Sequence, residues 1–402
     1  LRRVEALEKQ VETDDPTELK AYWNKGLRFK SADNAFTARI SGKIHIDTFL
    51  MSSDRKLDSF VKSHGDSFDD GIGFRRARIG LSGTLYSRFV YKADYDFSGG
   101  STEFKDVYVG VSDLPGNTIV KVGHFREPFS LQSMTSVSGL LFIERSQLQQ
   151  LTPSRNTGIA AFGTALDKRA TWAVGVFYNT NAYGDGGSDG DISATARVTC
   201  LPWYEGDDRL FHAGVAYSRR GEDDIQFKTG PEIAFGPDLV DTDGFATQSP
   251  HLIALDSANL YGFESALVMG PFSTHAEYVR VDIDARHGRD ADLWSYYAEA
   301  GYFLTGEHRS YDKEDGAPGS VKPLSEFDSD DGGLGAFELV ARSSILDLDD
   351  HSILNGGENT SYTAGINWFL NPSICVSANY LVSRVEKQGG ADIFIMRVAF
   401  EF

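Results

Sequence analysis

The chain has 402 residues, a formal net charge of −19 and 41% hydrophobic residues. The negative charge argues against a nucleic acid as partner, because binding to a phosphate backbone needs a basic surface. No apolar run reaches the roughly 18 residues that a membrane-spanning helix requires. Any passage through a membrane must therefore be made by β-strands, and a content of 12% aromatic residues with 41 glycines suits a barrel that is apolar on one side only.

The first residues differ in pattern from the rest of the chain. Residues 1–12 read LRRVEALEKQVE, in which Val4, Leu7 and Val11 follow heptad spacing. This spacing predicts a short helix over residues 1–15, either a coiled coil that joins several copies or a single amphipathic helix with frayed ends. Residues 16–33 are predicted to be a polar linker, and residues 34–402 a transmembrane β-barrel.

From about residue 35 the hydrophobic period changes to two. In the last segment every second residue from Phe394 to Phe402 is apolar, whereas Arg397 and Glu401 lie on the opposite face. Because side chains alternate across a strand, one face can meet lipid while the other meets water. Repetition of this pattern predicts an all-β fold, an antiparallel transmembrane barrel of about sixteen strands. The segments lie near residues 35–49, 73–86, 88–98, 104–112, 117–124, 156–165, 169–179, 191–200, 210–220, 258–269, 272–283, 292–305, 334–346, 361–370, 374–385 and 391–402.

The connections between these segments alternate between short turns and long polar loops. An even strand number puts both ends of the barrel on one side, which is predicted to be the periplasm. By this parity residues 125–155 form the third external loop, which we expect to fold inward and narrow the pore. Residues 306–333 are long although they belong to the periplasmic set, and we expect them to fold back toward the lumen.

The sequence supports a soluble fold, a catalytic site or a metal site less well than it supports a membrane barrel. A soluble β-propeller or sandwich is the rival fold, but the chain lacks a blade-length repeat, and a polar lumen explains its charged mid-strand residues better than a dry core does. The string from His64 to Ser67 has hydrolase residue types without a G-x-S-x-G motif, so no catalytic residue is predicted. No metal site is predicted either, and Ca²⁺ or Mg²⁺ at the acidic external loops is the alternative to plain solvation. Cys200 and Cys375 are predicted to be unpaired.

Inward-facing charges differ between the two halves of the predicted barrel. The early strands place cations inward, among them Arg78, Lys121 and Arg197. Cations on one wall face acidic residues on the other and create an electric field across the pore. Such a field orients polar solutes but selects only weakly between cations and anions. The sequence therefore predicts a weakly selective, water-filled pore. The acidic wall is predicted to comprise Glu264, Glu277, Glu299 and Glu338.

Several strings together resemble the phosphate-selective porin O and P family. They are FRRARIGLSG (74–83), VGHFREPFSLQSMTS (122–136), FIER (142–145), GPFSTHAEYVR (270–280), GYFLTGEHRSY (301–311), GAFELVARSS (335–344) and YTAGINWF (362–369). The resemblance implies a homotrimer in the outer membrane of a Gram-negative-type bacterium, with the lipid bilayer and lipopolysaccharide as surroundings. It also implies passive movement of small solutes, and in some members phosphate or pyrophosphate selectivity. Phe402 resembles the signal that the barrel-assembly machinery reads.

Candidate pore residues follow from both arguments, since anion selectivity needs fixed cations and the arginine fork suits oxyanions. The resemblance matches Lys43, Arg75, Arg76, Ser133, Arg145 and Lys322 to family positions, and the strand register adds Arg78, Lys121 and Arg197. The family's phosphate-gripping lysine matches Ser133, and its arginine ladder falls near residues 224–235, where Lys228 is the only cation. A dedicated phosphate channel is therefore the alternative to the weakly selective porin, and a structural or adhesin-like barrel is a second alternative. For Glu127, Glu144 and Arg145 an ion pair that stiffens the wall or loop is a competing role. The candidates are Lys43, Arg75, Arg76, Arg78, Lys121, Arg126, Ser133, Arg145, Arg197 and Lys322, and one member of the Arg75–Arg76 pair is expected to face away from the lumen unless a bulge intervenes.

Overall fold

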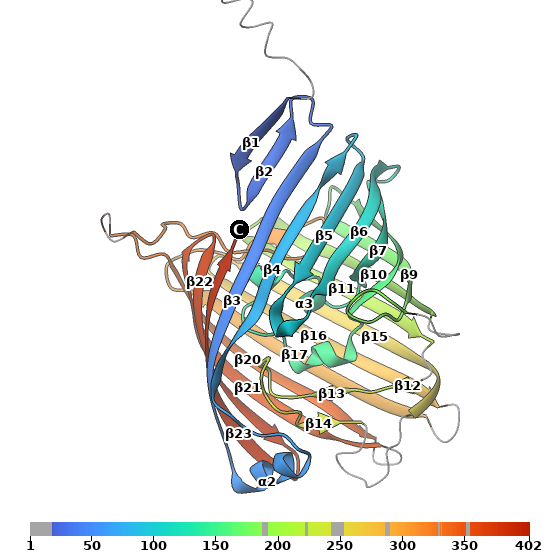
Figure 1. Ribbon diagram of the computed structural model, residues 1–402, viewed down its shortest axis with the longest axis vertical. Coiled ribbons are helices and arrows are strands. Elements are labelled where there is room, and N and C mark those ends of the chain that lie inside the picture. The colour runs from blue at the N-terminus through green and yellow to red at the C-terminus, as the bar shows by residue number, and fades with distance from the viewer. Residues whose placement is uncertain are drawn as a thin grey trace, which may run out of the picture.

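Sixteen long antiparallel strands close into a barrel in the computed structural model (Figure 1). The structure describes residues 18–186, 192–221, 224–242, 253–285, 290–328, 330, 332–350 and 354–402. Each barrel strand pairs with its neighbours in sequence, and the last strand pairs with the first. The barrel strands are β3 (Thr37–Ser53), β4 (Gly71–Leu85), β5 (Phe89–Asp96), β6 (Glu103–Leu114), β7 (Thr118–Arg126), β8 (Arg155–Ala165), β9 (Ala170–Tyr178), β10 (Ile192–Gly206), β11 (Arg209–Arg220), β15 (Ile253–Met269), β16 (Phe272–Ala285), β17 (Ala291–Phe303), β20 (Ala336–Asp350), β21 (Leu354–Asn371), β22 (Ile374–Val385) and β23 (Gly389–Glu401).

Each predicted segment overlaps one of these strands, so the predicted barrel of about sixteen antiparallel strands is confirmed. The largest difference in bounds is at β21, which starts at Leu354 although the predicted segment starts at residue 361. This early part of β21 is polar and pairs with the acidic end of β20, from Asp347 to Asp350. Backbone hydrogen bonds hold the two strands together there without the apolar alternation that the sequence analysis relied on.

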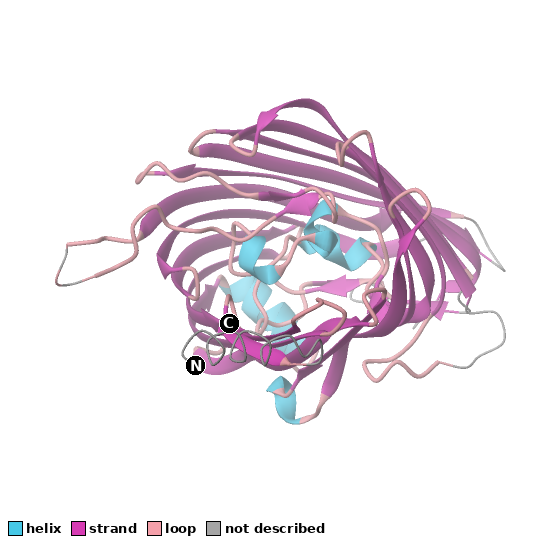
Figure 2. Ribbon diagram, turned by 90° about the horizontal axis from the view of Figure 1, so that it is seen from above, coloured by secondary structure: helices cyan, strands magenta, loops and turns pink. Residues whose placement is uncertain are grey.

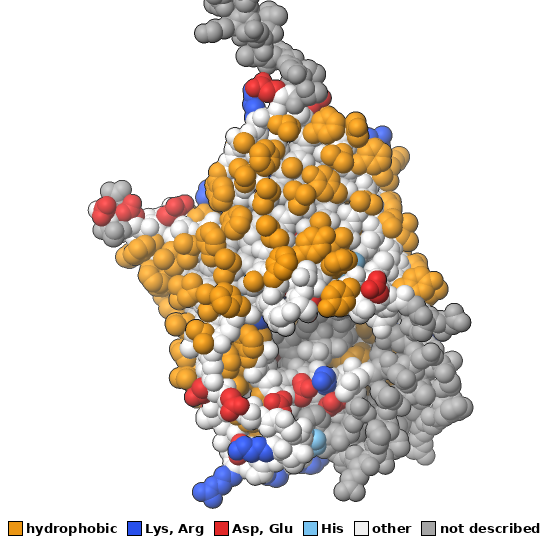
Figure 3. Space-filling view, viewed as in Figure 1, with side chains coloured by type: hydrophobic (Ala, Val, Ile, Leu, Met, Phe, Trp, Pro, Cys, Tyr) orange, Lys and Arg blue, Asp and Glu red, His pale blue; other side chains and the backbone are white. Residues whose placement is uncertain are grey.

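The outer face of the barrel is apolar. Along β23, Phe394, Met396 and Val398 are 42%, 39% and 44% exposed, whereas Ile395 and Arg397 on the other face are buried. Figure 3 shows apolar side chains spread over this side of the wall, with charged side chains gathered toward its two ends. Such a band is costly in water and is stabilised by contact with lipid.

The two ends of the barrel carry different connections. The short turns lie at one end together with the C-terminus, and we call this end the turn rim; it comprises residues 86–88, 115–117, 166–169, 207–208, 270–271, 304–335 and 372–373. The opposite end, the loop rim, comprises residues 54–70, 97–102, 127–154, 179–191, 221–252, 286–290, 351–353 and 386–388, some of which lie outside the described residues.

Short elements lie in these connections. The loop 54–70 contains α2 (Arg55–Ser63), which begins at the N-cap Asp54 and buries Leu57 and Val61. None of the described helices is long and apolar enough to cross a membrane. The remaining short elements are η1 (Ser98–Gly100), α3 (Leu131–Met134), η2 (Val137–Gly139), η3 (Gln147–Leu151), β12 (Asp224–Ile225), β13 (Lys228–Thr229), β14 (Val240–Asp241), β18 (Tyr311–Asp312) and β19 (Ala317–Pro318).

A β-hairpin occupies most of the predicted linker 16–33, so that prediction is wrong for the described part. The hairpin consists of β1 (Leu19–Trp23) and β2 (Leu27–Ser31). Strand β2 pairs with residues 37–40 of β3, the part of β3 beyond its pairing with β23. The hairpin thus satisfies backbone groups that would otherwise form an open edge. The helix predicted for residues 1–15 lies outside the described residues.

The end of the chain is fitted against the start of the barrel. The backbone amides of Gly42 and Phe402 each donate to the other residue's carbonyl, at 2.9 and 3.0 Å. The ring of Phe402 stacks on Trp23 with centroids 6.0 Å apart. A Cβ atom added at Gly42 would lie 2.5 Å from two carbon atoms of the Phe402 ring, so only glycine lets the terminal ring lie flat on β3.

We therefore expect Gly42→Ala to lower the stability of the refolded barrel. The added methyl group forces the ring of Phe402 away from β3, and overpacking of this kind costs about 1–3 kcal/mol. Thermal melting in detergent measures the effect. In a Phe402→Ala background the same substitution should cost much less, and an equal cost in both backgrounds would contradict the proposed clash.

Candidate functional site

The loop 127–154 lies inside the ring of strands, where its helical turns are visible in Figure 2. The backbone N–H groups of Leu131 and Gln132 each donate to the carboxylate of Glu277 at 2.7 Å. The side-chain amide of Gln132 donates to Glu299 at 3.1 Å. Glutamates on β16 and β17 therefore anchor the loop on one side of the lumen.

Glu144 anchors the same loop on the opposite side. Its carboxylate accepts hydrogen bonds from Arg75, Arg76 and Arg397 at 2.9, 3.3 and 2.6 Å. Arg397 also binds both carboxylate oxygens of Asp47, each at 2.6 Å. Burial alone would raise the pKa of Glu144, but the guanidinium groups of Arg76, Arg75 and Arg397 hold that pKa well below its ordinary value. The loop carboxylate is thus a fixed anion among three cations.

Both members of the adjacent pair Arg75 and Arg76 reach Glu144 because β4 bulges at this point. His45 pairs with Arg76 and Ile46 pairs with Phe74, which leaves Arg75 as an extra residue in the strand. A bulge places two consecutive side chains on one face. The bulge that lets both arginines face the lumen is therefore present.

The turn 304–335 reaches back toward the lumen, as expected for its length. Arg309 is fully buried and donates to Glu338, to the carbonyl of Gly139 at 3.1 Å and to that of Leu140 at 3.2 Å. Arg197 on β10 donates to the carbonyl of Gly316 at 2.7 Å. The turn therefore ties the loop 127–154 to the wall from the turn-rim side.

These contacts bury the predicted acidic wall. Glu264, Glu277, Glu299 and Glu338 all face inward, but the side chains of Glu264, Glu299 and Glu338 are only 2%, 1% and 0% exposed. Each carboxylate already has close donors: Glu264 binds Arg197, and Glu299 binds His275. The predicted transverse field between two wet walls is thus wrong on this side, because these carboxylates hold loops in place and do not line water.

The opposite wall keeps a group of partly exposed guanidinium groups, which we call the arginine cluster: Arg75, Arg78, Arg126, Arg145 and Arg155. Arg75, Arg155 and Arg78 are 30%, 17% and 15% exposed, and they pair with Glu144, Asp106 and Asp96. Burial lowers the pKa of Arg145 to about 10; Glu144 opposes this effect, while Arg155, Arg78 and Arg75 add to it. The neighbouring guanidinium groups therefore disfavour the charged form of Arg145.

Arg126 and Arg145 differ from the other members of the cluster. Arg126 donates to the carbonyl of Ser133, and Arg145 donates to the carbonyls of Gln132 and Thr135 at 2.7 and 2.8 Å. A carbonyl partner has no net charge and does not neutralise a guanidinium group, although Glu144 and Asp106 act on Arg145 and Arg126 without a direct hydrogen bond. Cations outnumber carboxylates among the inward charged side chains of β4 to β8 and residues 144–145. The cations are Arg75, Arg76, Arg78, Lys92, Lys105, Lys121, Arg126, Arg145 and Arg155, and the carboxylates are Asp94, Asp96, Glu103, Asp106 and Glu144.

The remaining candidates lie in separate places. Lys43 binds Glu401 at 2.6 Å near the turn rim, and Lys322 is exposed on the turn 304–335. Lys121 lies over the ring of Phe162 at 4.5 Å. Ser133 is buried and donates to Gln149 at 3.0 Å, so it stabilises the loop internally. Lys43 is the cross-strand register partner of Arg78 and so lies beside the arginine cluster, although its ammonium group binds Glu401. The Arg197 side chain is buried against Glu264, and both Arg197 and Lys322 lie outside the cluster.

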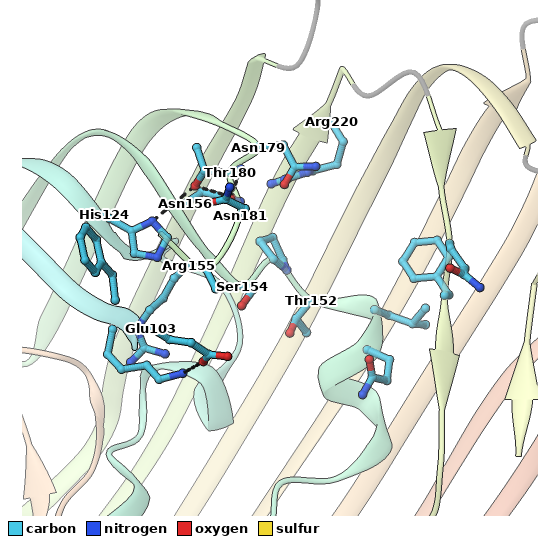
Figure 4. Close-up of a pocket in the computed structure, with 18 of the residues that line it drawn as sticks. Glu103, His124, Thr152, Ser154, Arg155, Asn156, Asn179, Thr180, Asn181 and Arg220 are labelled. Atoms are coloured by element: carbon cyan, nitrogen blue, oxygen red, sulfur yellow. Dashed lines mark hydrogen bonds and ion pairs between the residues drawn. The ribbon is translucent and has the colours of Figure 1, made fainter. Parts of the chain in front are cut away.

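A cavity of about 380 Å³ lies at the loop rim, lined by both polar and apolar side chains (Figure 4). Arg155 belongs both to the cavity lining and to the cluster. On the cavity wall Thr180 lies 3.3 Å from a ring nitrogen of His124, and its backbone N–H donates to Asn156 at 2.8 Å. Amide and hydroxyl groups of this kind can exchange hydrogen bonds with a hydrated solute without holding it tightly.

Two other chemical possibilities find little support in the described structure. Ser67 donates to Asp69, while His64 approaches the carbonyl of Phe60 at 2.9 Å, so the two do not form a nucleophile and base pair. Within the described ranges, no group of three or more His, Cys, Asp or Glu residues is arranged to hold a metal ion. Cys200 and Cys375 are free, as predicted.

The model of the family described as "Phosphate-selective porin O and P" matches residues 45–402. The chain belongs to this family. Porin O of Pseudomonas aeruginosa is 26% identical over 430 residues, a match that covers 97% of this chain and 94% of the relative. The protein is therefore a porin that forms a channel in the outer membrane of a Gram-negative bacterium.

Solved structures with a similar fold are also porins or outer-membrane proteins. The anion-selective porin from Comamonas acidovorans has a TM-score of 0.59 at 12% identity, and the match covers 91% of this porin and all of that chain. The trimer form of in-vitro folded OmpT from Vibrio cholerae has a TM-score of 0.55 at 12% identity, with 92% of this porin and all of that chain covered. At these identities the similarity shows the fold alone.

Some residues that shape the lumen of this porin are absent from the sequence-based candidates. Arg155 and Asp106 form an ion pair at 2.8 Å between β8 and β6. Arg309 lies in the quoted string GYFLTGEHRSY, but its partner Glu338 is 29 residues away. Charged residues at inward positions of predicted strands are the available signal, and among these residues it applies only to Asp106, which lies in the predicted segment 104–112. Arg155 precedes the predicted segment 156–165 and falls in the predicted loop.

Proposed function

We propose that this porin is a passive diffusion channel for small hydrophilic solutes and ions, with a weak preference for anions. The arginine cluster carries this proposal. Two of its members bind only carbonyl oxygens in the described structure, while the glutamates across the lumen are buried under the loop 127–154 and the turn 304–335. Fixed cations beside a water-filled path favour anions, and their partial pairing with carboxylates keeps the preference weak.

A phosphate- or pyrophosphate-selective channel is the second candidate, and family membership favours it. Two local features weigh against it. Ser133, where the family has a phosphate-gripping lysine, is buried within its own loop. Lys228, the only cation in the region 224–235, pairs with Asp238 at 2.9 Å. A chain of anion sites, which a selective channel needs for transfer, is therefore incomplete here.

We also propose an orientation and an assembly for the barrel. The turn rim faces the periplasm, and the loop rim faces outward toward lipopolysaccharide.

The porin assembles as a homotrimer; a trimer form is known for a protein of similar fold. The apolar outer surfaces of Val109, Val122 and Ile159, which are 63%, 49% and 51% exposed on shorter strands, suit contact with either lipid or a neighbouring copy. Insertion would require the barrel-assembly machinery, with Phe402 as its signal.

Planar-bilayer recording with added phosphate distinguishes the two candidate functions. In this experiment phosphate replaces chloride up to roughly 10 mM. The chloride current of the weakly selective porin should then fall only in proportion to the chloride that has been replaced. A phosphate-selective channel should show saturable block at far lower phosphate concentrations. A sealed barrel without conductance would favour the structural or adhesin-like alternative instead.

A further inference from the structure

Inside the barrel a carboxylate of the chain itself is held by converging donors that do not belong to the arginine cluster. The carboxylate belongs to Glu232, in a segment of the loop rim that we call the strap, residues 226–242. The Nε of Arg342 donates to Glu232 at 2.9 Å, and a second nitrogen of the same guanidinium donates to the same oxygen. Ser344 donates its hydroxyl at 2.5 Å, and the backbone N–H of Gln147 donates at 3.0 Å.

The donors around Glu232 form a built site. Arg342, Ser344 and Gln147 are 4%, 0% and 2% exposed, and Thr363 adds a hydroxyl at 3.4 Å. They come from three separate parts of the chain: β20, β21 and the loop 127–154. Arg342 is further fixed by a hydrogen bond to the carbonyl of Glu144 at 2.9 Å and by an ion pair with Glu299 at 3.6 Å. A planar guanidinium with converging hydroxyl and amide donors is the arrangement that recognises a carboxylate.

The strap that carries Glu232 is tied down at other points. The ring of Phe235 stacks on Phe49 of β3 with centroids 5.3 Å apart. Leu239 and Val240 are buried in the main apolar cluster. Glu232 is therefore a tethered ligand, and tethering gives it a high effective concentration at the site, on the order of millimolar or more. A free anion must compete with that concentration.

We propose that Arg342, Ser344, Thr363 and the Gln147 amide form an intrinsic binding site for small carboxylate solutes, which Glu232 of the strap occupies as a resident competitor. The site goes beyond the proposed diffusion function, because it does not depend on which ions cross the pore. Because the donors of the site suit a carboxylate, removal of the Glu232 side chain should leave a site that a free carboxylate ion can occupy.

Chemical rescue tests this proposal directly. Glu232→Ala removes two carbons and two oxygens, the heavy atoms of acetate. In detergent the variant should melt lower than the unmodified porin, and acetate should raise its Tm by roughly 2 °C or more, with saturation in the range of about 1–50 mM. The unmodified porin should show less than about a tenth of this shift, since its own carboxylate fills the site.

Matched controls separate the site from general salt effects. Sodium chloride at equal ionic strength and the neutral isostere acetamide should not rescue Glu232→Ala. Asp238→Ala, a change in the same strap that removes only the exposed pair with Lys228, should show no acetate response. The double variant Glu232→Ala/Arg342→Met should lose the response. An acetate effect that persists without Arg342, or no acetate-specific effect in Glu232→Ala, would overturn the proposal.

The test remains decisive if Glu232→Ala does not refold in chloride. In that case acetate in the refolding buffer should restore the folded fraction, and failure of acetate to restore it would also refute the site. Both readouts are independent of conductance. A porin that conducts as proposed but shows no rescue loses only this inference, and a sealed barrel that shows rescue loses only the diffusion function.

Discussion

Glu144→Gln is expected to loosen the loop 127–154 and to increase the single-channel conductance. The carboxylate of Glu144 binds Arg75, Arg76 and Arg397, and it is the loop's main polar link to the wall formed by β3, β4 and β23. An amide cannot compensate three guanidinium charges, and Arg76 is 1% exposed. Removing one partner of a buried ion pair costs about 3–5 kcal/mol, because the remaining charges are left uncompensated.

The measurement combines thermal melting with bilayer recording. We expect a lower Tm and a conductance increase of roughly 1.5- to 3-fold, since a displaced constriction loop widens the path. Glu103→Gln is the matched control, because it neutralises a carboxylate on the same wall whose partner Lys105 stays near the lumen surface. An unchanged Tm and conductance in Glu144→Gln, or equal effects in the control, would show that Glu144 does not hold the loop.

The double substitution Arg126→Gln/Arg145→Gln is expected to abolish the anion preference. Both guanidinium groups donate to loop carbonyls, so their positive charges are not cancelled locally. Two charges removed at short range change the relative energy of a cation and an anion by about 1 kcal/mol or more in a wet pore. The chloride-to-potassium permeability ratio should therefore fall roughly five- to tenfold and cross toward cation preference.

The control for this pair is Lys168→Gln. Lys168 lies at the turn rim, its side chain is 51% exposed, and it pairs with Glu314. A charge in that position is screened by salt and should leave the permeability ratio within about a factor of two. If the double variant keeps the ratio of the unmodified porin, the arginine cluster is not the selectivity element.

The strand pattern could be predicted from the sequence because lipid imposes it on each strand separately. Outward residues such as Phe394 and Val398 must be apolar whatever lies elsewhere in the chain, so a period of two survives in single segments. The hairpin β1–β2 was not recognised, because its short strands lie at the turn rim, where this demand is absent. The start of β21, at the loop rim, is polar and likewise shows no apolar period of two.

The lumen could be predicted only in part, since its contacts join distant residues. Register gave the inward direction of Glu277 and Glu338 correctly. It could not show that the loop 127–154 and the turn 304–335 cover these carboxylates, as in the pair of Glu338 with Arg309. The pairing of Glu232 with Arg342 spans 110 residues and likewise leaves no local signal.

The reversal potential of the unmodified porin in a KCl gradient tests the proposed function most directly. We expect open channels with a chloride-to-potassium permeability ratio above one but below about ten, because the cations of the arginine cluster exceed their carboxylate partners by a small margin. A ratio below one would contradict the assignment of the exposed wall as basic. A ratio far above ten would contradict weak selectivity and support a dedicated anion channel.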